Sequence, residues 1–289
     1  NGYIQLDILT AAGCEYTTRE NITLADAINT ALTAPTTICP SESVTISVAT
    51  TSQATYTFYV GGTQQQESSS ATFTTTGISR TSSVVITITN ASGCSETVST
   101  VINVVDLEDG GSITPTNSTI CMGGDSPSIS NLVSATLEDY SSAASITYFW
   151  EQSFDAVSWT TVAGTESSLA AAAVTGIVTT TYFRRGAEVV NGDSDSCEIL
   201  YTIPITVNVE ASITPTISSS TGAFTFCVGD SPTFESQTIP AGVVTYTWSY
   251  FNGTSTVTST GTGTTTEVTI VANGYIQLDI LTAAGCEYT

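Results

Sequence analysis

Cysteine and aspartate are the residues of this chain whose types and spacing could carry chemistry. Seven cysteines are spread along 289 residues, and Asp125 and Asp230 each lie in a GDSP tetrapeptide. Histidine and lysine are both absent. This absence excludes a Ser-His-Asp triad, a Cys-His pair, a histidine-bound metal, a lysine Schiff base and a P-loop. We expect Asp125 and Asp230 to bond backbone amides in turns, and we expect no catalytic residue.

The charge balance argues against nucleic acids and anionic membranes as partners. Acidic residues number 26 and basic residues 4, for a formal net charge of −22. Nucleic acids and anionic membranes are bound through Lys/Arg clusters, so we expect neither nucleic-acid binding nor membrane insertion. Arg184 and Arg185 are adjacent, which places their side chains on opposite faces of an expected strand, and we expect both to pair with carboxylates.

An acidic stretch is the one candidate for a metal site. Asp106, Glu108 and Asp109 lie at an expected module junction, and Asp125 follows soon after. Oxygen-rich junctions of extracellular modules can hold Ca²⁺. The stretch lacks a D-x-D-x-D-G loop, so a solvated acidic linker is the default interpretation and Ca²⁺ the weaker alternative. We otherwise expect no metal and no cofactor.

Most of the sequence follows patterns typical of β-strands. Thr, Val, Ile and Tyr alternate with polar residues, and a hydrophobic share of 40% is too high for a disordered acidic chain. Three segments share one order: an opening cysteine, an alternating strand with a central aromatic residue, and a closing cysteine in a turn. The pattern predicts an all-β chain of tandem immunoglobulin-like β-sandwich modules. The central aromatics, which we place in the cores, are Phe58, Trp150 and Trp248.

An exact internal repeat sets the expected module boundaries. Residues 1–17 recur without change as residues 273–289. We therefore interpret the chain as one period of a tandem array plus an overlap. Residues 1–33 would be the C-terminal part of a module begun in the preceding repeat. The modules that follow would be 34–110, 111–210 and 211–289, the last completed by the next repeat.

The same alignment predicts the last strand of each module. Apolar residues stand 8 and 10 positions after each closing cysteine. This spacing of two is typical of a strand with one buried face. These residues are Ile22 and Leu24, Ile102 and Val104, and Ile205 and Val207.

The alignment also predicts how the cysteines pair. We expect one disulfide inside each module, which accounts for six of the seven cysteines. The expected pairs are Cys39–Cys94, Cys121–Cys197 and Cys227–Cys286. Cys14 is the copy of Cys286, so its partner would belong to the preceding repeat. Paired cysteines indicate an oxidising, extracellular setting.

The middle module resembles a known family. It contains YFWEQSFDAVSW at 148–159 and TTTYFRRGAEV at 179–189. These segments resemble the Y-x-W-x-x-S-x-D…W motif and the T-x-Y-x-R-R strand in the Ig-like and PKD-like repeats of giant secreted adhesins of gliding Bacteroidetes. The first module departs from the pattern, because Phe58 stands in place of the core Trp and CPSES in place of C-x-G-D-S. The resemblance implies an exported protein that serves as a filamentous surface adhesin or stalk.

These observations favour a structural function. We expect a segment of a stiff, disulfide-reinforced extracellular filament, used for surface attachment or gliding, whose partners are neighbouring copies end to end. A glycan or surface ligand would be bound at a distal tip outside this chain. The alternative is a carbohydrate-binding module array of a secreted polysaccharide-degrading system. A carboxylate-pair glycosidase needs only Asp and Glu, but three cysteine-closed modules leave no room for a catalytic domain.

Overall fold

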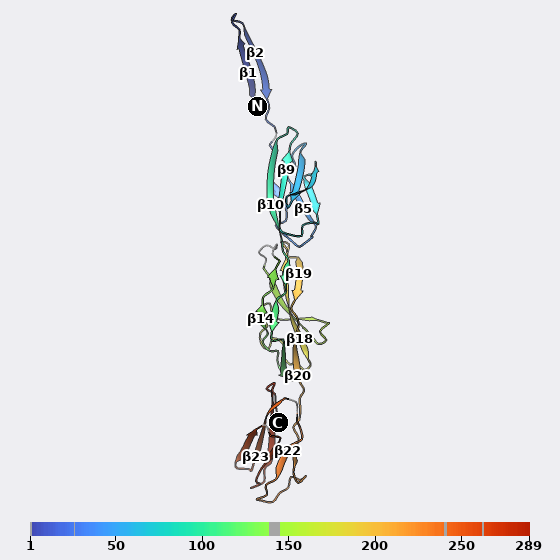
Figure 1. The fold of residues 1–289 in the computed structure, drawn as a ribbon, viewed down its shortest axis with the longest axis vertical. Helices are drawn as coiled ribbons and strands as arrows, with labels where there is room; N and C mark the ends of the chain where they lie inside the picture. Colours follow the sequence, from blue (N-terminus) through green and yellow to red (C-terminus); the bar gives the residue numbers. More distant parts are fainter. Residues whose placement is uncertain (1, 26, 139–144, 240–241, 262) are drawn as a thin grey trace. The chain divides into compact units, whose positions relative to one another are not determined.

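The chain folds into strands. The computed structural model describes residues 2–25, 27–138, 145–239, 242–261 and 263–289, and all the regular elements in these ranges are β-strands (Figure 1). The described residues include no helix able to span a membrane. Two compact units are formed. Unit 1 comprises Asn1–Asp109, Thr136–Ile146 and Glu188–Ile199, and unit 2 comprises Gly110–Ala135, Thr147–Ala187 and Leu200–Thr289.

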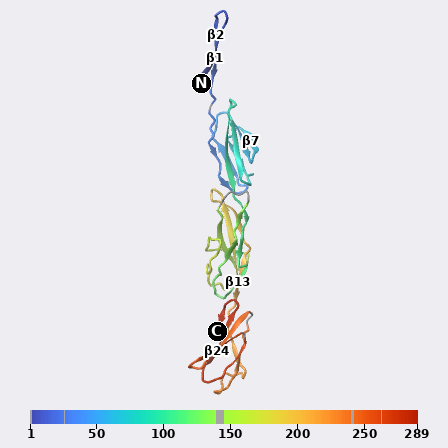
Figure 2. The ribbon, with the colours of Figure 1, turned by 60° about the vertical axis from the view of Figure 1, so that its left-hand side comes forward.

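Unit 1 contains the first sandwich. Its larger sheet has the order β4 (Thr37–Ile38), β10 (Ser95–Val104), β9 (Ser82–Thr89), β6 (Thr55–Val60) and β7 (Thr63–Ser68), the last of which is labelled in Figure 2. Its smaller sheet has the order β3 (Leu32–Thr33), β5 (Val44–Val48) and β8 (Thr72–Thr75). Alternate residues of both sheets, such as Ile46 of β5 and Ile86 of β9, meet in one buried cluster around Phe58. Two sheets sharing one core are a β-sandwich.

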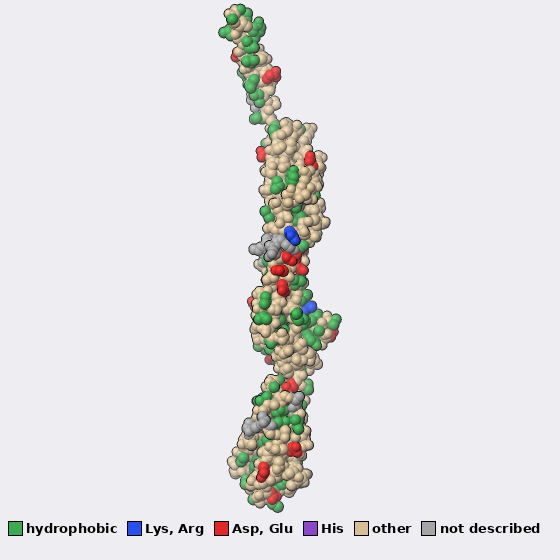
Figure 3. Space-filling model, viewed as in Figure 1, with side chains coloured by type: hydrophobic (Ala, Val, Ile, Leu, Met, Phe, Trp, Pro, Cys, Tyr) green, Lys and Arg blue, Asp and Glu red, His purple; other side chains and the backbone are tan. Residues whose placement is uncertain are grey.

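Unit 1 also contains a hairpin that lies outside this sandwich. Strands β1 (Gly2–Leu9) and β2 (Glu15–Ile22) pair in eight successive positions, and all their residues are exposed. Figure 3 shows apolar side chains along the hairpin surface. The rest of unit 1 is the short pair β11 (Leu107–Asp109) and β15 (Thr136–Leu137), with the adjoining ends of β18 (Thr181–Val190) and β19 (Ser196–Tyr201).

Unit 2 contains two separate cores. The second sandwich has a main sheet in the order β13 (Asn117–Cys121), β20 (Ile205–Glu210), β18, β16 (Thr147–Ser153) and β17 (Thr160–Val162), with β19 beside β18. The pair β12 (Ser112–Thr114) and β14 (Ser130–Val133) contributes Ile113 to the core. Trp150 and Phe183 are the large residues of this core, and both are fully buried.

The third sandwich has two small sheets. One has the order β21 (Ile217–Ser219), β22 (Thr233–Ser236) and β25 (Thr265–Glu267). The other has the order β24 (Thr256–Gly261), β23 (Val243–Phe251), β26 (Tyr275–Thr282) and β27 (Glu287–Tyr288). Phe234 from the first sheet meets Trp248 and Leu278 from the second in the third core.

The predicted fold class is confirmed: the chain is all-β and consists of tandem Ig-like sandwiches. Phe58, Trp150 and Trp248, which we placed in the cores, are all buried there. The aligned apolar residues of the last strands divide into two groups. Ile102, Val104, Ile205 and Val207 are at most 1% exposed, whereas Ile22 is 47% and Leu24 79% exposed. The difference arises because the hairpin β1–β2 packs on no second sheet among the described residues.

Candidate functional site: two sets of cysteine turns

The disulfides do not follow the predicted pairing. Cys39 is bonded to Cys197 within unit 1, and Cys121 is bonded to Cys286 within unit 2. Each bond joins the opening cysteine of one expected module to the closing cysteine of the next. The predicted pairs Cys39–Cys94, Cys121–Cys197 and Cys227–Cys286 are therefore wrong. Cys14, Cys94 and Cys227 are exposed free thiols.

The length of strand β10 explains why Cys39 cannot reach Cys94. Cys94 stands directly before β10, whereas Cys39 follows β4, which pairs with the far end of β10 at Asn103 and Val104. Ten strand residues at about 3.3 Å each separate the two ends by roughly 30 Å. A disulfide needs Cα atoms within about 7 Å. The opening and closing cysteines of the first sandwich therefore lie at opposite ends of it.

The three opening cysteines sit in equivalent turns. In each turn the cysteine carbonyl accepts the N–H of the third residue along, and the second residue along has a positive φ. The N–H of that second residue donates to the carbonyl of an isoleucine in the same sandwich. The sets of cysteine, positive-φ residue and isoleucine are Cys39, Ser41 and Ile78; Cys121, Gly123 and Ile177; and Cys227, Gly229 and Ile270. Cys227, which is unbonded, thus has the same backbone setting as the two bonded opening cysteines.

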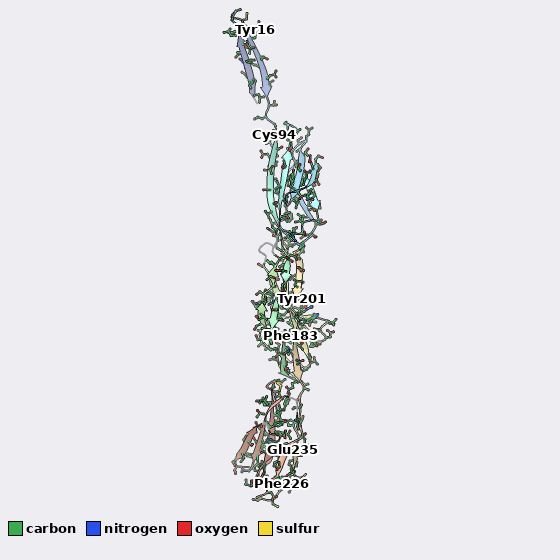
Figure 4. All side chains as sticks on the ribbon, viewed as in Figure 1. Tyr16, Cys94, Phe183, Tyr201, Phe226 and Glu235 are labelled. Atoms are coloured by element: carbon green, nitrogen blue, oxygen red, sulfur yellow. A yellow bond between two sulfur atoms is a disulfide. The ribbon has the colours of Figure 1, made fainter. Side chains whose placement is uncertain are left out.

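The closing turns also form one class. In each, a Thr or Asn side-chain oxygen accepts the N–H of the residue four positions later, which closes the turn locally. These bonds are Thr10 to Cys14 (3.1 Å), Asn90 to Cys94 (3.0 Å), Asn191 to Asp195 (2.9 Å) and Thr282 to Cys286 (3.3 Å). In the third of these the cysteine is Cys197, two residues further on, which keeps it on the same face of its strand. Figure 4 labels the unbonded Cys94 in its turn.

Polar contacts surround the disulfide of unit 1. The Glu42 carboxylate accepts the Cys39 N–H at 2.8 Å and the Asn191 side-chain amide at 3.1 Å, so it bridges an opening turn to a closing turn. The Gly192 N–H donates to the Thr37 carbonyl at 3.2 Å. Asp230 repeats half of this arrangement, because its carboxylate accepts the Cys227 N–H at 2.7 Å.

Glu210 has the bridging position at the disulfide of unit 2. Its carboxylate accepts the Thr282 hydroxyl at 3.0 Å and the Tyr288 hydroxyl at 3.3 Å. Burial and the negative charge of Glu210 together raise the pKa of Tyr288 above its ordinary value. The carboxylate therefore ties the closing turn of the third sandwich to the end of β20.

The acidic candidates for Ca²⁺ are divided between the units. In unit 1, Glu198 accepts the Leu107 N–H at 3.1 Å and shares a hydrogen bond with Asp106. Burial, followed by the contact with Asp106, raises the pKa of Glu198. Glu108 accepts the Thr136 hydroxyl at 3.4 Å. In unit 2, Asp125 accepts the Gly176 N–H at 3.3 Å, which is the turn role expected for it.

No metal cluster emerges from these acidic residues. The described residues hold no group of three or more Cys, Asp or Glu placed to bind a metal ion, and Asp106, Glu108, Asp109 and Asp125 do not form one.

Sequence reasoning missed the side chains that join turns or strands distant in the sequence. These residues are Glu42, Asn191, Glu198 and Glu210. One signal was present, because an acidic residue follows both Cys39 and Cys227 by three positions. That spacing allows the side chain to return to the cysteine N–H, as in an Asx-type turn. Nothing in the sequence around Glu42 indicates that its second partner is Asn191.

One family model matches part of the chain, and solved structures match it at low sequence identity. The domain of unknown function DUF8696 matches residues 109–211, about a third of the chain. No curated protein matches the chain significantly. The Ig-like assignment rests on the sheets and cores described above.

Three solved structures are among those that match this chain. Three N-terminal domains of the highly immunogenic outer capsid protein Hoc of bacteriophage RB49 are 11% identical over 88% of this chain and 91% of that chain, with a TM-score of 0.41. A titin I-band fragment is 11% identical over 87% and 91%, with a TM-score of 0.41. Three FN domains of chicken CNTN1 are 9% identical over 90% and 95%, with a TM-score of 0.33.

Proposed function

We propose that this chain is a structural repeat segment of an extracellular filamentous adhesin or stalk. Its task is mechanical: tandem sandwiches, bonded one to the next, carry a distal binding tip away from a surface and serve attachment or gliding. The observation that carries the proposal is the pairing of Cys39 with Cys197 and of Cys121 with Cys286. A bond inside a module stabilises only that module, whereas a bond between modules reinforces the array.

Composition supports the setting and the absence of catalysis. Disulfides persist in oxidising compartments, which favours an exported protein. A chain without histidine or lysine lacks the common general bases and nucleophile activators. The net charge of −22 keeps neighbouring filaments apart. The resemblance to adhesin repeats of gliding Bacteroidetes points to the same function.

Immunogold labelling of intact source cells and of thin sections of the same cells tests this function. Antibodies raised against the purified chain should label fibres that project from the cell surface, and pre-absorption with the chain should abolish the labelling. Labelling confined to the cytoplasm, or to a compact secreted particle, would show that the chain is not a filament segment.

One observation favours the alternative, a carbohydrate-binding module. The third sandwich has a cleft of about 630 Å³ whose lining includes the exposed aromatics Phe224 and Tyr275. Exposed aromatic rings in a cleft are typical of small-molecule sites. Retention of the chain on insoluble polysaccharides, lost in a Phe224→Ala/Tyr275→Ala variant, would favour this alternative over the filament.

A further inference from the structure

Two identical strands in this chain have different partners. Strands β1 and β26 lie in the repeated 17-residue segment, so Leu6 is the copy of Leu278 and Ile8 the copy of Ile280. Strand β1 pairs with β2 along its whole length, from Gly2 opposite Ile22 to Leu9 opposite Glu15. On the corresponding edge, β26 pairs with β27 only at Ile280 and Leu281. The edge of β26 from Tyr275 to Asp279 therefore has no strand beside it among the described residues.

The apolar residues of β26 are buried, whereas their copies in β1 are exposed. Leu278 and Ile280 are 2% and 1% exposed in the third core, whereas Leu6 and Ile8 are 54% and 48% exposed. Among the described residues, the hairpin thus has a complete pair of strands and no core, and the third sandwich has a core and a last strand, β27, of two residues. Each contains what the other lacks.

The cleft of the third sandwich is at the position that the last strand, β10, occupies in the first sandwich. In the first sandwich, β10 pairs on one side with β9 and on the other with β4, the two residues before Cys39. In the third sandwich, the equivalent two residues before Cys227 are Thr225 and Phe226, which belong to no strand. These residues line the cleft together with Tyr275 and Ile276 of β26. The cleft is thus bounded by the two segments that a last strand would join.

The segment that fits this cleft begins at Thr18, within β2, and continues to Leu24. Apolar residues at 8 and 10 positions after a closing cysteine are buried in the first two sandwiches, whereas Ile22, the equivalent residue after Cys14, is exposed. We infer that the cleft of the third sandwich receives residues 18–24, which are the last five residues of β2 and the two after it, from a second copy of this chain. Thr18 then lies opposite Leu278 and Ile22 opposite Gly274, the register that β2 already has with β1.

The exchange conserves the contacts that the hairpin already makes. Because β26 has the sequence of β1, each backbone bond between β1 and residues 18–22 has an equivalent in the new pair, while β27 already holds the places of Glu15 and Tyr16 beside β26. The Arg19 guanidinium now donates to Gln5 at 2.6 Å and lies 4.8 Å from the Tyr3 ring centre. Gln277 and Tyr275 are the copies of these two partners. Burial of the apolar face is gained in addition, which favours the exchanged form.

The inserted strand also brings a disulfide partner to Cys227. We call the inserted strand and this disulfide together the joint. Its turn is of the opening class, and both bonded opening cysteines join a closing turn of the next sandwich along the chain. The sandwich that follows β2 in the second copy is the first sandwich, whose closing cysteine is the free Cys94. The bond forms by exchange with a small disulfide such as oxidised glutathione. Two protein thiols lose two protons and two electrons, and two glutathione thiols are released.

This joint deepens the proposed filament function, on which it rests, and mixed crosslinking of two full-length variants tests it. Cys14→Ser/Cys94→Ser retains only Cys227 as a free thiol, and Cys14→Ser/Cys227→Ser retains only Cys94. All three cysteines are exposed, so both variants keep the cores intact. In a glutathione redox buffer the mixture should form a disulfide heterodimer at least tenfold faster than either variant alone forms a homodimer. Equal rates would overturn the inference.

A second substitution tests the strand itself. Ile22→Asp, added to the variant that retains Cys94, should reduce heterodimer formation to the homodimer rate, because a carboxylate buried at this position would lose its hydration without gaining an ion partner. Val101→Asp is the matched control, since Val101 is 50% exposed and takes no part in the joint. Hydrogen exchange at the Ile276 and Leu278 amides should slow in the heterodimer. A heterodimer that is insensitive to Ile22→Asp would overturn the strand insertion. Labelled surface fibres in which Cys227 remains alkylatable would refute the joint and leave the filament function standing.

Discussion

Arg184 and Arg185 are neighbours in β18 with opposite environments. Arg184 pairs with the Glu151 carboxylate at 2.6 Å and stacks 3.7 Å from the Tyr201 ring centre, as the expectation of a carboxylate partner requires. Arg185 is fully buried and pairs with no carboxylate among the described residues. Its guanidinium donates instead to neutral oxygens of Asn131, Ser167, Gly110 and Val133. The expectation is therefore wrong for Arg185, because four convergent oxygens replace the carboxylate.

Arg185→Lys should destabilise unit 2. A lysine cannot satisfy four acceptors in the planar arrangement of a guanidinium, so buried carbonyls would lose their partners. We expect a loss of about 2–4 kcal/mol in the free energy of unfolding, measured by urea denaturation. Arg184→Lys is the matched control and should cost less than about 1 kcal/mol, because its ion pair is partly exposed. Equal losses for the two variants would contradict this account.

The cysteine pairing gives a second prediction at the scale of the residue. Trypsin can cut only after the four arginines, which places Cys39 in peptide 20–80, Cys94 and Cys121 in 81–184, and Cys197 in 186–289. In a Cys121→Ser variant, unreduced digestion should release 81–184 and leave 20–80 joined to 186–289. A product in which 20–80 is joined to 81–184 would show that Cys39 pairs with Cys94, inside its own module.

The sequence separates the cysteines into opening and closing classes but does not predict which members meet. The classes follow from local turn chemistry, such as Asn90 or Thr282 four residues before a cysteine. The pairing depends on the length of the strand between the two turns. That length places Cys39 and Cys94 at opposite ends of one sandwich, which turn chemistry alone does not reveal.

At the scale of the element, Glu198 of β19 couples this strand to β11 in unit 1. Its carboxylate accepts the Leu107 N–H while it lies against Asp106. The alternation of apolar residues predicts long strands such as β10 and β26. It does not predict β11 and β15, three and two residues long, because a strand that short has no periodic signal.

Unit 1 should lose stability as the pH rises through the pKa of Glu198. Because burial and Asp106 raise this pKa above the unfolded value, Glu198 contributes stability that is fully present below about pH 4.5. That contribution is lost as the carboxyl group ionises in the folded state. Glu198→Gln should therefore reduce the fall in melting temperature between pH 4.5 and pH 7. Glu235→Gln, in the third sandwich, should leave the fall unchanged; an equal effect of both substitutions would refute the assignment.

At the scale of the whole molecule, the two disulfides close long loops. Cys39 and Cys197 are 158 residues apart, and Cys121 and Cys286 are 165 apart. In the chain-entropy model a loop of this length stabilises the folded state by up to about 5 kcal/mol. Cys39→Ser/Cys197→Ser should lower the denaturant midpoint of unit 1, followed by urea unfolding, whereas Cys14→Ser should not. An unchanged midpoint would show that the unfolded ensemble is not restricted by this bond.

The two loops overlap between residues 121 and 197, and this overlap determines what a protease can do to the chain. Every peptide bond from Cys39 to Cys286 is spanned by at least one disulfide, so no single cut in that range separates the two halves. Bonds confined to single modules would have left the connections between modules severable. A chain with a protease site inserted between Gly110 and Gly111 should, after cleavage, migrate as one species without reductant and as two with it. Damage at one position, or even at two, would then leave the two ends of the chain joined. Their separation would need a reductant, or one cut in each of the segments 39–121, 121–197 and 197–286.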